Sequence, residues 1–288
     1  MNHGREANLR GSLLMTAAMA GFAIEDMFLK AAAKHMPVGQ VITLFGLLGT
    51  LTFVLLTLRR SEPPFPPASR SRPMLIRSGF EITGRLFYSL AIALTPLSVA
   101  SAILQATPLV VVAGAAVIFG ETVGLRRWAA IVAGFAGVLI IIRPGLEGFD
   151  ALSILTVIGL IGFAGRDLAT RAAPPTMSNL QLGVIGFTML TIAGIIILIV
   201  NADYRTPDTT GLALTFCATT IGVFAYTALT GAMRTGQVSA VTPFRYTRLL
   251  FALILGVVVF NERPDQWTLL GSAIVVASGI YILTRRGK

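Results

Sequence analysis

The chain has 288 residues, of which 55% are hydrophobic and 12% are charged, and its formal net charge is +10. This composition excludes a soluble protein, because a soluble core of this size has no room for so many apolar side chains. The positive charge does not indicate a nucleic-acid partner, since the basic residues gather between apolar runs and at the two ends.

Ten apolar runs follow one another, each close to the roughly 20 residues that a helix needs to cross a bilayer. The runs do not alternate apolar with polar residues as barrel strands do. We therefore expect an all-α integral membrane protein of ten transmembrane helices. The expected spans are residues 11–33, 38–58, 74–95, 99–119, 126–142, 151–172, 178–200, 210–232, 239–260 and 266–283.

The basic residues also predict the orientation of the chain in the membrane. Thirteen arginines and lysines of the connections and ends fall on the side of the amino terminus, and four fall on the other: Lys34, Arg143, Arg205 and Arg263. Short segments rich in Lys and Arg resist translocation. Both termini are therefore expected in the cytoplasm, with the chain in a bacterial-type inner membrane.

An internal repeat appears when the sequence is shifted by 141 residues. The shift aligns Gly-Phe-Ala-Ile-Glu-Asp at 21–26 with Gly-Phe-Ala-Gly-Arg-Asp at 162–167, and it carries Glu121 onto Glu262. One shift that serves separate regions indicates two copies of one unit.

The two predicted units are residues 1–145 and 146–288, with five spans each. Because five is odd, the second unit enters the membrane from the opposite side, which makes the repeat inverted. Inverted repeats around a central cavity are typical of secondary transporters, in which the halves rock to expose a central site to each side in turn.

Several short motifs resemble those of the EamA-type proteins of the drug/metabolite transporter superfamily. In the first half they are FYSLA (87–91), TPLSVA (95–100), TPL (107–109), FGE (119–121), RRW (126–128), GFAGV (134–138) and RPG (143–145), and in the second FNERP (260–264) and SGIY (278–281). Asn261 stands where the pattern has glycine. The resemblance implies a central cavity lined by the first, third, fourth, sixth, eighth and ninth helices, in proteins that export amino acids or carry other metabolites.

The third span carries charges inside the membrane. Glu81 and Arg85 lie four residues apart, on one helical face, where they can pair. Arg85 lies about 16 Å into its span, near the midplane, and Tyr88 follows one turn later. A charge at this depth needs a partner or a watery cavity, so a structural ion pair and a cavity-lining role both remain open.

Other candidates for the substrate site lie on the first, fourth, sixth, eighth and ninth spans. They are Gln105, the aromatic residues Phe22, Phe163 and Tyr226, and the two arginines Arg245 and Arg248. The arginines either face the cavity or extend to the membrane surface. Pro108 on the fourth span is either a hinge or a static kink.

Two charge pairs are expected at i to i+4 spacing, Asp26 with Lys30 and Asp167 with Arg171. They are either structural clamps or carriers in proton coupling. Glu121 and Glu262, at the heads of short loops, are expected to cap or bond those loops rather than to bind substrate.

These features predict a secondary transporter, an exporter or facilitator of small organic metabolites, most of all amino acids. An amphoteric wall suits a zwitterion: Arg85, or Arg245 if it faces inward, would meet a carboxylate, and Glu81 would meet an ammonium. The aromatic rings would hold apolar groups. A vitamin, nucleoside, adenosyl cofactor or cationic drug is the alternative. The expected partners are the substrate and the lipid bilayer, and the oligomeric state stays open. The sequence shows no nucleophile with its base, no metal cluster, no cofactor motif and no phosphate-binding loop, which disfavours an enzyme, and no filter sequence, which disfavours a channel.

Overall fold

The computed structural model describes residues 2–119, 124–143, 150–171, 176–235 and 242–284, and these are helical apart from short connections. The helices are α1 (Asn2–Ala32), α2 (Val38–Arg59), η1 (Pro67–Arg70), α3 (Arg72–Leu94), α4 (Leu97–Leu104), α5 (Thr107–Phe119), α6 (Leu125–Ile142), α7 (Ser153–Arg171), α8 (Asn179–Asn201), α9 (Thr209–Thr235), η2 (Thr242–Tyr246), α11 (Thr247–Phe260) and α12 (Gln266–Thr284).

Each of the ten expected spans contains a helix, which confirms the all-helical fold with ten spans. Five segments are long and apolar enough to cross a membrane by length and composition alone: α1, α2, α4 with α5, α8 and α9. α3 and α7 carry several charged residues, and α6, α11 and α12 have shorter apolar stretches. The domain limits at 145 and 146 stay a prediction.

The fourth and ninth spans are broken at corresponding places. α4 ends at Leu104 and α5 begins at Thr107, just before Pro108, which lacks a backbone N–H. The Thr107 hydroxyl donates to the Leu104 carbonyl at 2.6 Å and so satisfies the group that the proline leaves open. In the second repeat, the short helix η2 precedes α11, and the break falls near Tyr246, which is Gln105 shifted by 141 residues.

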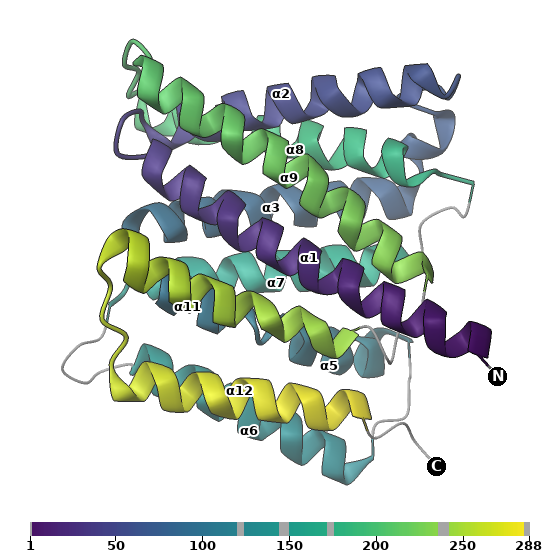
Figure 1. Cartoon of the computed structure of the whole chain (residues 1–288), viewed down its shortest axis with the longest axis vertical. Coiled ribbons are helices and arrows are strands. Elements are labelled where there is room, and N and C mark those ends of the chain that lie inside the picture. Colours follow the sequence, from purple (N-terminus) through teal and green to yellow (C-terminus); the bar gives the residue numbers. More distant parts are fainter. Residues whose placement is uncertain (1, 120–123, 144–149, 172–175, 236–241, 285–288) are drawn as a thin grey trace.

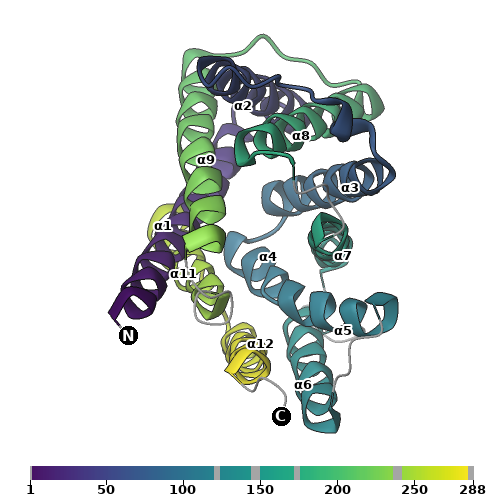
Figure 2. The ribbon, with the colours of Figure 1, turned by 90° about the vertical axis from the view of Figure 1, so that its right-hand side faces the viewer.

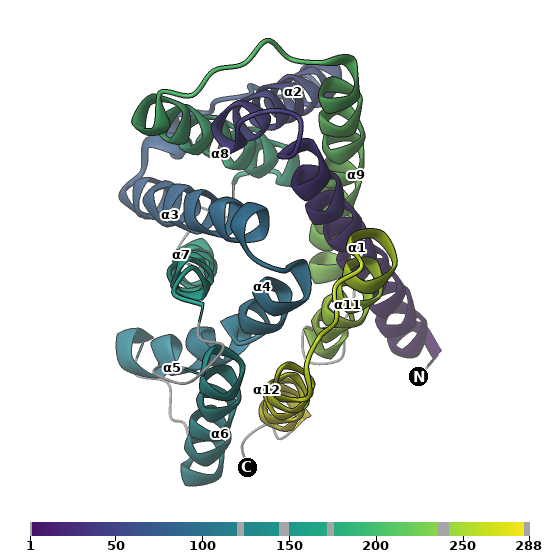
Figure 3. The ribbon, with the colours of Figure 1, turned by 90° about the vertical axis from the view of Figure 1, so that its left-hand side faces the viewer.

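The helices pack as an inverted repeat requires. α1 lies against α9, and its repeat mate α7 lies against α3, while α2 pairs with α8 and α6 with α12 (Figure 1). Viewed along the helices, α9, α1, α11 and α12 form one side of the bundle and α3, α7, α5 and α6 the other (Figures 2 and 3). Each side therefore draws helices from both repeats.

Small residues allow the two equivalent crossings. A Cβ at Gly21 would lie 2.8 Å from the Cβ of Ala225, and a Cβ at Gly162 would overlap the backbone of Gly84. These four positions correspond under the same 141-residue shift. Close approach of helices through small residues is a common way to pack inside a membrane.

The outer surface of the bundle is apolar, which suits contact with lipid. Leu51, Ile199 and Val258 are among many large apolar side chains that are more than half exposed. Such a surface is unfavourable in water. α1 begins and α12 ends at the same end of the bundle (Figure 1). We call the opposite end, where α4 and α12 begin, the outer end, a name that follows the orientation predicted from the sequence.

Asn261 ends α11 in the left-handed region, with φ 54°. This conformation explains why the family pattern has glycine here. Asparagine is among the few other residues that adopt it at small cost, so the turn geometry is kept.

Candidate functional site

Glu25 and Asp26 lie next to each other on α1 and are buried, with 0% and 1% exposure. α1 is otherwise apolar here, and its packing against α9 and α11 encloses both carboxylates. A buried carboxylate in a membrane helix needs a cation or a hydrogen-bond donor as partner. Both residues find such partners on other helices.

Glu81 on α3 is shared by three arginines. Arg77 and Arg85 of the same helix approach it at 3.4 and 3.6 Å, and Arg166 of α7 approaches at 3.2 Å. The predicted Glu81–Arg85 pair is therefore formed. Arg85 also contacts Glu25, with its Nη1 3.3 Å from Oε1. Arg85 thus joins α1 to α3 across the interior of the bundle.

Asp26 and Asp167, which correspond in the two repeats, bind different partners. Asp26 accepts from Arg248 at 2.5 Å and from the Tyr88 hydroxyl at 2.9 Å. Asp167 pairs with its neighbour Arg166 at 2.8 Å and has Arg245 at 3.7 Å. Arg245 and Arg248 therefore face the interior and do not extend to the membrane surface.

These charged side chains form one cluster between the two sides of the bundle, which we call the central charge network. It holds four acids, three of them buried and Asp167 partly buried, and five arginines, which are buried or partly buried, so its formal charge is 5 − 4 = +1. Its members are Glu25, Asp26, Glu81, Asp167, Arg77, Arg85, Arg166, Arg245 and Arg248.

Aromatic rings cover the guanidinium groups of the network. The Phe163 ring lies 5.0 Å from the Arg166 guanidinium carbon and 5.6 Å from that of Arg85. Phe22 and Tyr88 lie 5.4 and 5.6 Å from Arg248 in the same way. Contacts of this kind stabilise a cation that is removed from water. The structure thus brings the predicted residues Phe22, Tyr88 and Phe163 to the charges.

Tyr226 and Gln105 are placed differently. Tyr226 packs edge-on against Phe53, with centroids 5.5 Å apart, and lies 6.3 Å from Phe187. Its ring therefore belongs to an aromatic cluster with α2 and α8, and the residue also lies close enough to Arg77, Glu81 and Arg166 to interact with their charges. Gln105 is buried at the α4–α5 break, and its Nε2 has no hydrogen-bond partner within the described part of the chain. The functional roles of both residues, and of Pro108, stay predictions.

The expected pair of Asp26 with Lys30 is wrong. Lys30 lies one turn later, at the end of α1, where its Nζ donates to the carbonyls of Ile92 and Thr95 at 3.1 and 2.5 Å. It also lies 3.6 Å from Glu262. Asp26 faces the interior and binds Arg248, a closer cation that intrahelical spacing cannot reveal. The side chain of Arg171 lies outside the described residues.

Glu262 bonds the start of α4. Its carboxylate accepts from the backbone N–H groups of Leu97 and Ser98 at 2.7 and 3.0 Å and from the Ser98 hydroxyl at 2.7 Å. This agrees with the expected capping role, but the capped helix belongs to the other repeat. A carboxylate at this place also complements the positive end of the helix dipole. Glu121 lies outside the described residues.

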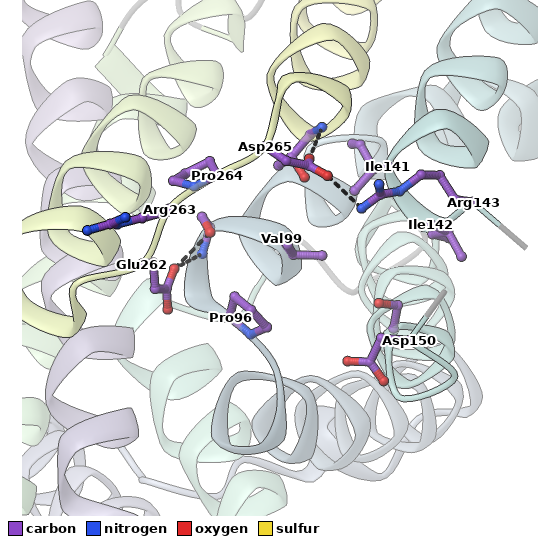
Figure 4. Close-up of a pocket in the computed structure, with 13 residues that line it drawn as sticks. Pro96, Val99, Ile141, Ile142, Arg143, Asp150, Glu262, Arg263, Pro264 and Asp265 are labelled. Atoms are coloured by element: carbon purple, nitrogen blue, oxygen red, sulfur yellow. Dashed lines mark hydrogen bonds and ion pairs between the residues drawn. The ribbon is translucent and has the colours of Figure 1, made fainter. Parts of the chain in front are cut away.

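A pocket of about 300 Å³ opens beside this cap, at the outer end (Figure 4). Pro96, Val99, Glu262 and Asp265 are among its lining residues, and Arg143 bonds Asp265 across it at 2.7 Å. The pocket therefore lies where helices of the two sides meet. Among the described residues, no three His, Cys, Asp or Glu side chains are placed to hold a metal ion.

Sequence reasoning missed Glu25, Arg77 and Arg166 as members of the site. One signal was present, because the repeat alignment places Glu25 opposite Arg166, a pair of opposite charges inside two equivalent helices. Arg77 lies one turn before Glu81, at the same i to i+4 spacing that identified Arg85.

Comparison with known proteins gives related sequences and a related fold. The model of the EamA-like transporter family matches residues 9–143 and 151–285. A solved structure covers 93% of this chain and 98% of its own, with a TM-score of 0.59 and 18% identity, which shows a shared fold.

Three relatives are named for what they carry. The chain is 24% identical to an S-adenosylmethionine uptake transporter of Rickettsia prowazekii, over 76% of this chain and 74% of the relative. It is 28% identical to a riboflavin transporter of Rhizobium johnstonii, over 67% and 63%. It is 25% identical to a pseudopaline exporter of Pseudomonas aeruginosa, over 96% and 97%. With two matched copies that span nearly the whole sequence, the chain belongs to the EamA-like transporter family and is a multi-pass membrane protein.

Proposed function

We propose that this protein is a secondary transporter that moves a small amphoteric metabolite, an amino acid or a larger molecule that contains one, by alternating access. Its halves would rock about the central charge network, which would bind the substrate. It would work as an exporter or facilitator in a bacterial-type inner membrane, with both termini in the cytoplasm.

The central charge network is the observation that carries this proposal. Burying an ionised side chain in a membrane costs roughly 3 kcal/mol or more, and apolar packing would hold helices together without that cost. Here nine such side chains meet between the two sides of the bundle. Charges that cost this much are best explained by a substrate that takes part in the pairing.

The pairing favours a substrate that has both charges. If Arg85 and Glu25 separate, Glu25 loses its cation, and Arg85 is left to share Glu81 with two other arginines, which is unfavourable inside the bundle. A carboxylate can replace Glu25 at Arg85, and an ammonium can replace Arg85 at Glu25, so a zwitterion satisfies both. A cationic drug would leave the arginine without a partner.

The relatives and the aromatic rings extend the proposal to larger substrates. S-adenosylmethionine combines an amino acid with a purine nucleoside, and the paired rings of Tyr88 and Phe163, 5.8 Å apart, offer surfaces for a flat ring system. A transported vitamin such as riboflavin would use the rings and not the charges. An amino-acid-containing metabolite uses both kinds of group.

Counterflow into proteoliposomes tests the function. The purified protein is assayed with labelled phenylalanine, S-adenosylmethionine and riboflavin, each against its own unlabelled pool. We expect saturable counterflow of phenylalanine or S-adenosylmethionine, and a fall of about 100-fold or more in Arg85→Gln, because the change leaves Glu25 and Glu81 short of a cation. Arg59→Gln, at an exposed position at the end of α2, is the matched control. No counterflow of any probe would overturn the proposal.

Thiol labelling tests the orientation. Cys217 is the single cysteine, so Cys217→Ser gives a background into which Ser69→Cys or Asp208→Cys is introduced. In intact cells, an impermeant reagent should modify the cysteine at 208 and not the one at 69, since the two lie in loops at opposite ends of the bundle. Labelling at 69 from outside would reverse the assignment.

A further inference from the structure

The two repeats treat one pair of equivalent positions differently. Arg166 of α7 meets Glu81 of α3 at 3.2 Å. Under the 141-residue shift, the corresponding positions are Glu25 on α1 and Gly222 on α9. Gly222 has no side chain that could pair with Glu25. A Cβ there would lie 2.9 Å from Glu25 Oε2 and 3.1 Å from the ring of Phe45.

Only one of the two carboxylate oxygens of Glu25 has a partner among the described residues. Its Oε1 is paired with Arg85, and its Oε2 is buried without a hydrogen-bond partner in the described part of the chain. The other acids of the network have more cationic contacts or donors. Glu81 has three arginines, and Asp26 has Arg248 and Tyr88. Asp167 Oδ2 also lacks a hydrogen bond, but Arg245 lies 3.7 Å from it, whereas no ion pair reaches Glu25 Oε2 in the described part of the chain.

Apolar and aromatic groups lie beside this oxygen at Gly222, and the charges of Asp26 and Arg248 also act on the carboxylate. Phe45 is fully buried beside Gly222 and packs on Phe187 with ring centroids 5.4 Å apart, and Phe53 and Tyr226 continue the same cluster. Among such groups a carboxylate attracts a cation far more strongly than it would in water. A cation that reaches Glu25 is also favoured by the electron-rich faces of aromatic rings.

We infer that Glu25 binds the cationic group of the substrate, an ammonium or a sulfonium, and that Gly222 keeps space for that group. Arg85, released from Glu25, binds the carboxylate of the same substrate. This inference rests on the proposed function and differs from the prediction that Glu81 meets the ammonium, because three arginines occupy Glu81. Glu25 and Gly222 then decide that cargo must carry a positive charge.

Matched ligands that differ by one positive charge test this inference. In the counterflow assay, the uptake of labelled phenylalanine is measured in competition with phenylalanine and with 3-phenylpropionate, its deaminated analogue. If S-adenosylmethionine is the probe that the wild type carries, two matched competitors are used: S-adenosylhomocysteine, which lacks the sulfonium charge but keeps the ammonium, and the deaminated analogue of S-adenosylmethionine, which lacks the ammonium but keeps the sulfonium. The ratio of the inhibition constants of a competitor and its matched analogue measures how strongly the site prefers the positive charge. This ratio does not depend on the amount of folded protein.

In the wild type we expect the cationic competitor to bind at least about tenfold more tightly than its matched analogue. In Glu25→Gln this ratio should fall to near one, while a competitor without a carboxylate, phenylalanine amide, stays weak because Arg85 is intact. Glu25→Asp should restore part of the preference. Gly222→Ala should reduce it, and Gly186→Ala, a buried helical glycine whose added Cβ would meet nothing within 4 Å, should not.

The outcomes separate the inference from the proposed function. A wild type that carries phenylalanine or S-adenosylmethionine, with an unchanged preference in Glu25→Gln, overturns the inference alone. If riboflavin is the only probe that shows counterflow, the inference is also overturned, because riboflavin brings no cation. The protein would still be a transporter. A wild type that carries none of the probes overturns the proposed function, and the inference falls with it.

Discussion

The centre of the bundle and its outer end both join helices of the two sides through charged groups, but the contacts differ in kind. In the centre, side chains pair with side chains away from water, as Arg85 does with Glu25. At the outer end, Glu262 binds backbone N–H groups of α4, and Arg143 bonds Asp265 at the rim of a pocket. Water can replace the outer contacts when they open, whereas only another charged molecule can replace the central ones.

This difference suggests a division of work. Contacts that water can satisfy break at small cost, which suits an end that opens and closes. Contacts that need a charged replacement make the centre selective for its cargo. The following predictions test the comparison, beginning with the largest expected effect.

Glu81→Gln should be the most damaging change. Three arginines would lose the carboxylate that they share, and breaking a buried ionic cluster costs about 3–5 kcal/mol. We expect a large fall in the thermal unfolding temperature in detergent, with Arg77→Gln in the same chain restoring part of it. Asp203→Asn is the control, because Asp203 lies in a loop where it is partly exposed and its ion pair with Arg205 is at the surface. An unchanged unfolding temperature in Glu81→Gln would show that the central charge network does not stabilise the bundle.

Arg248→Gln should abolish transport with a smaller loss of stability. Asp26 keeps its bond from Tyr88 but loses the cation at 2.5 Å. Arg248→Lys should keep part of the activity, because it restores the charge without the planar group that lies between Phe22 and Tyr88. The uptake rates of both variants measure the loss of transport, and their unfolding temperatures measure the loss of stability. Normal uptake in Arg248→Gln would show that Asp26 needs no cation.

Glu262→Gln should open the outer end while leaving the fold intact. The amide oxygen can still accept from α4, but the charge at its first turn and the contact with Lys30 are lost, an effect of about 1 kcal/mol. In the Cys217→Ser background, a cysteine at Val99 in the outer pocket should react roughly fivefold faster with an impermeant reagent when Glu262 is changed. An unchanged rate would mean that this cap does not hold the end closed.

Asp208 should show the smallest effect, since it lies in an exposed loop before α9. The backbone N–H of Gly211, with His35 beside it, holds the pKa of the Asp208 carboxyl below its usual range. A lowered pKa means that this cap stabilises the fold above the unfolded value of about 3.9 and is lost as the pH falls through the folded value. The decrease in unfolding temperature between pH 7 and pH 3 should be slightly smaller in Asp208→Asn than in the wild type. A larger decrease in the variant would contradict the sign.

Spacing along a single helix predicted one ion pair of the site correctly and another wrongly. Glu81 and Arg85 were paired correctly because residues four apart on a helix share a face. The same rule failed for Asp26 and Lys30, which point to different layers of the bundle. Arg248, 222 residues from Asp26 in the sequence, binds it instead. Spacing reports only neighbours on one helix, and a buried acid binds whichever cation the packing brings nearest.

The sequence by itself determined the ten spans, the two repeats and the membrane as solvent, because hydrophobic length and repetition are properties of the chain alone. It also indicated that charges lie inside the membrane. Only the tertiary structure decided which charges meet. The crossing of α1 with α9 places Glu25 against Gly222, and the equivalent crossing of α7 with α3 places Arg166 against Glu81. Small residues set how closely those helices approach, so the partners of each buried charge depend on packing between segments far apart in the chain.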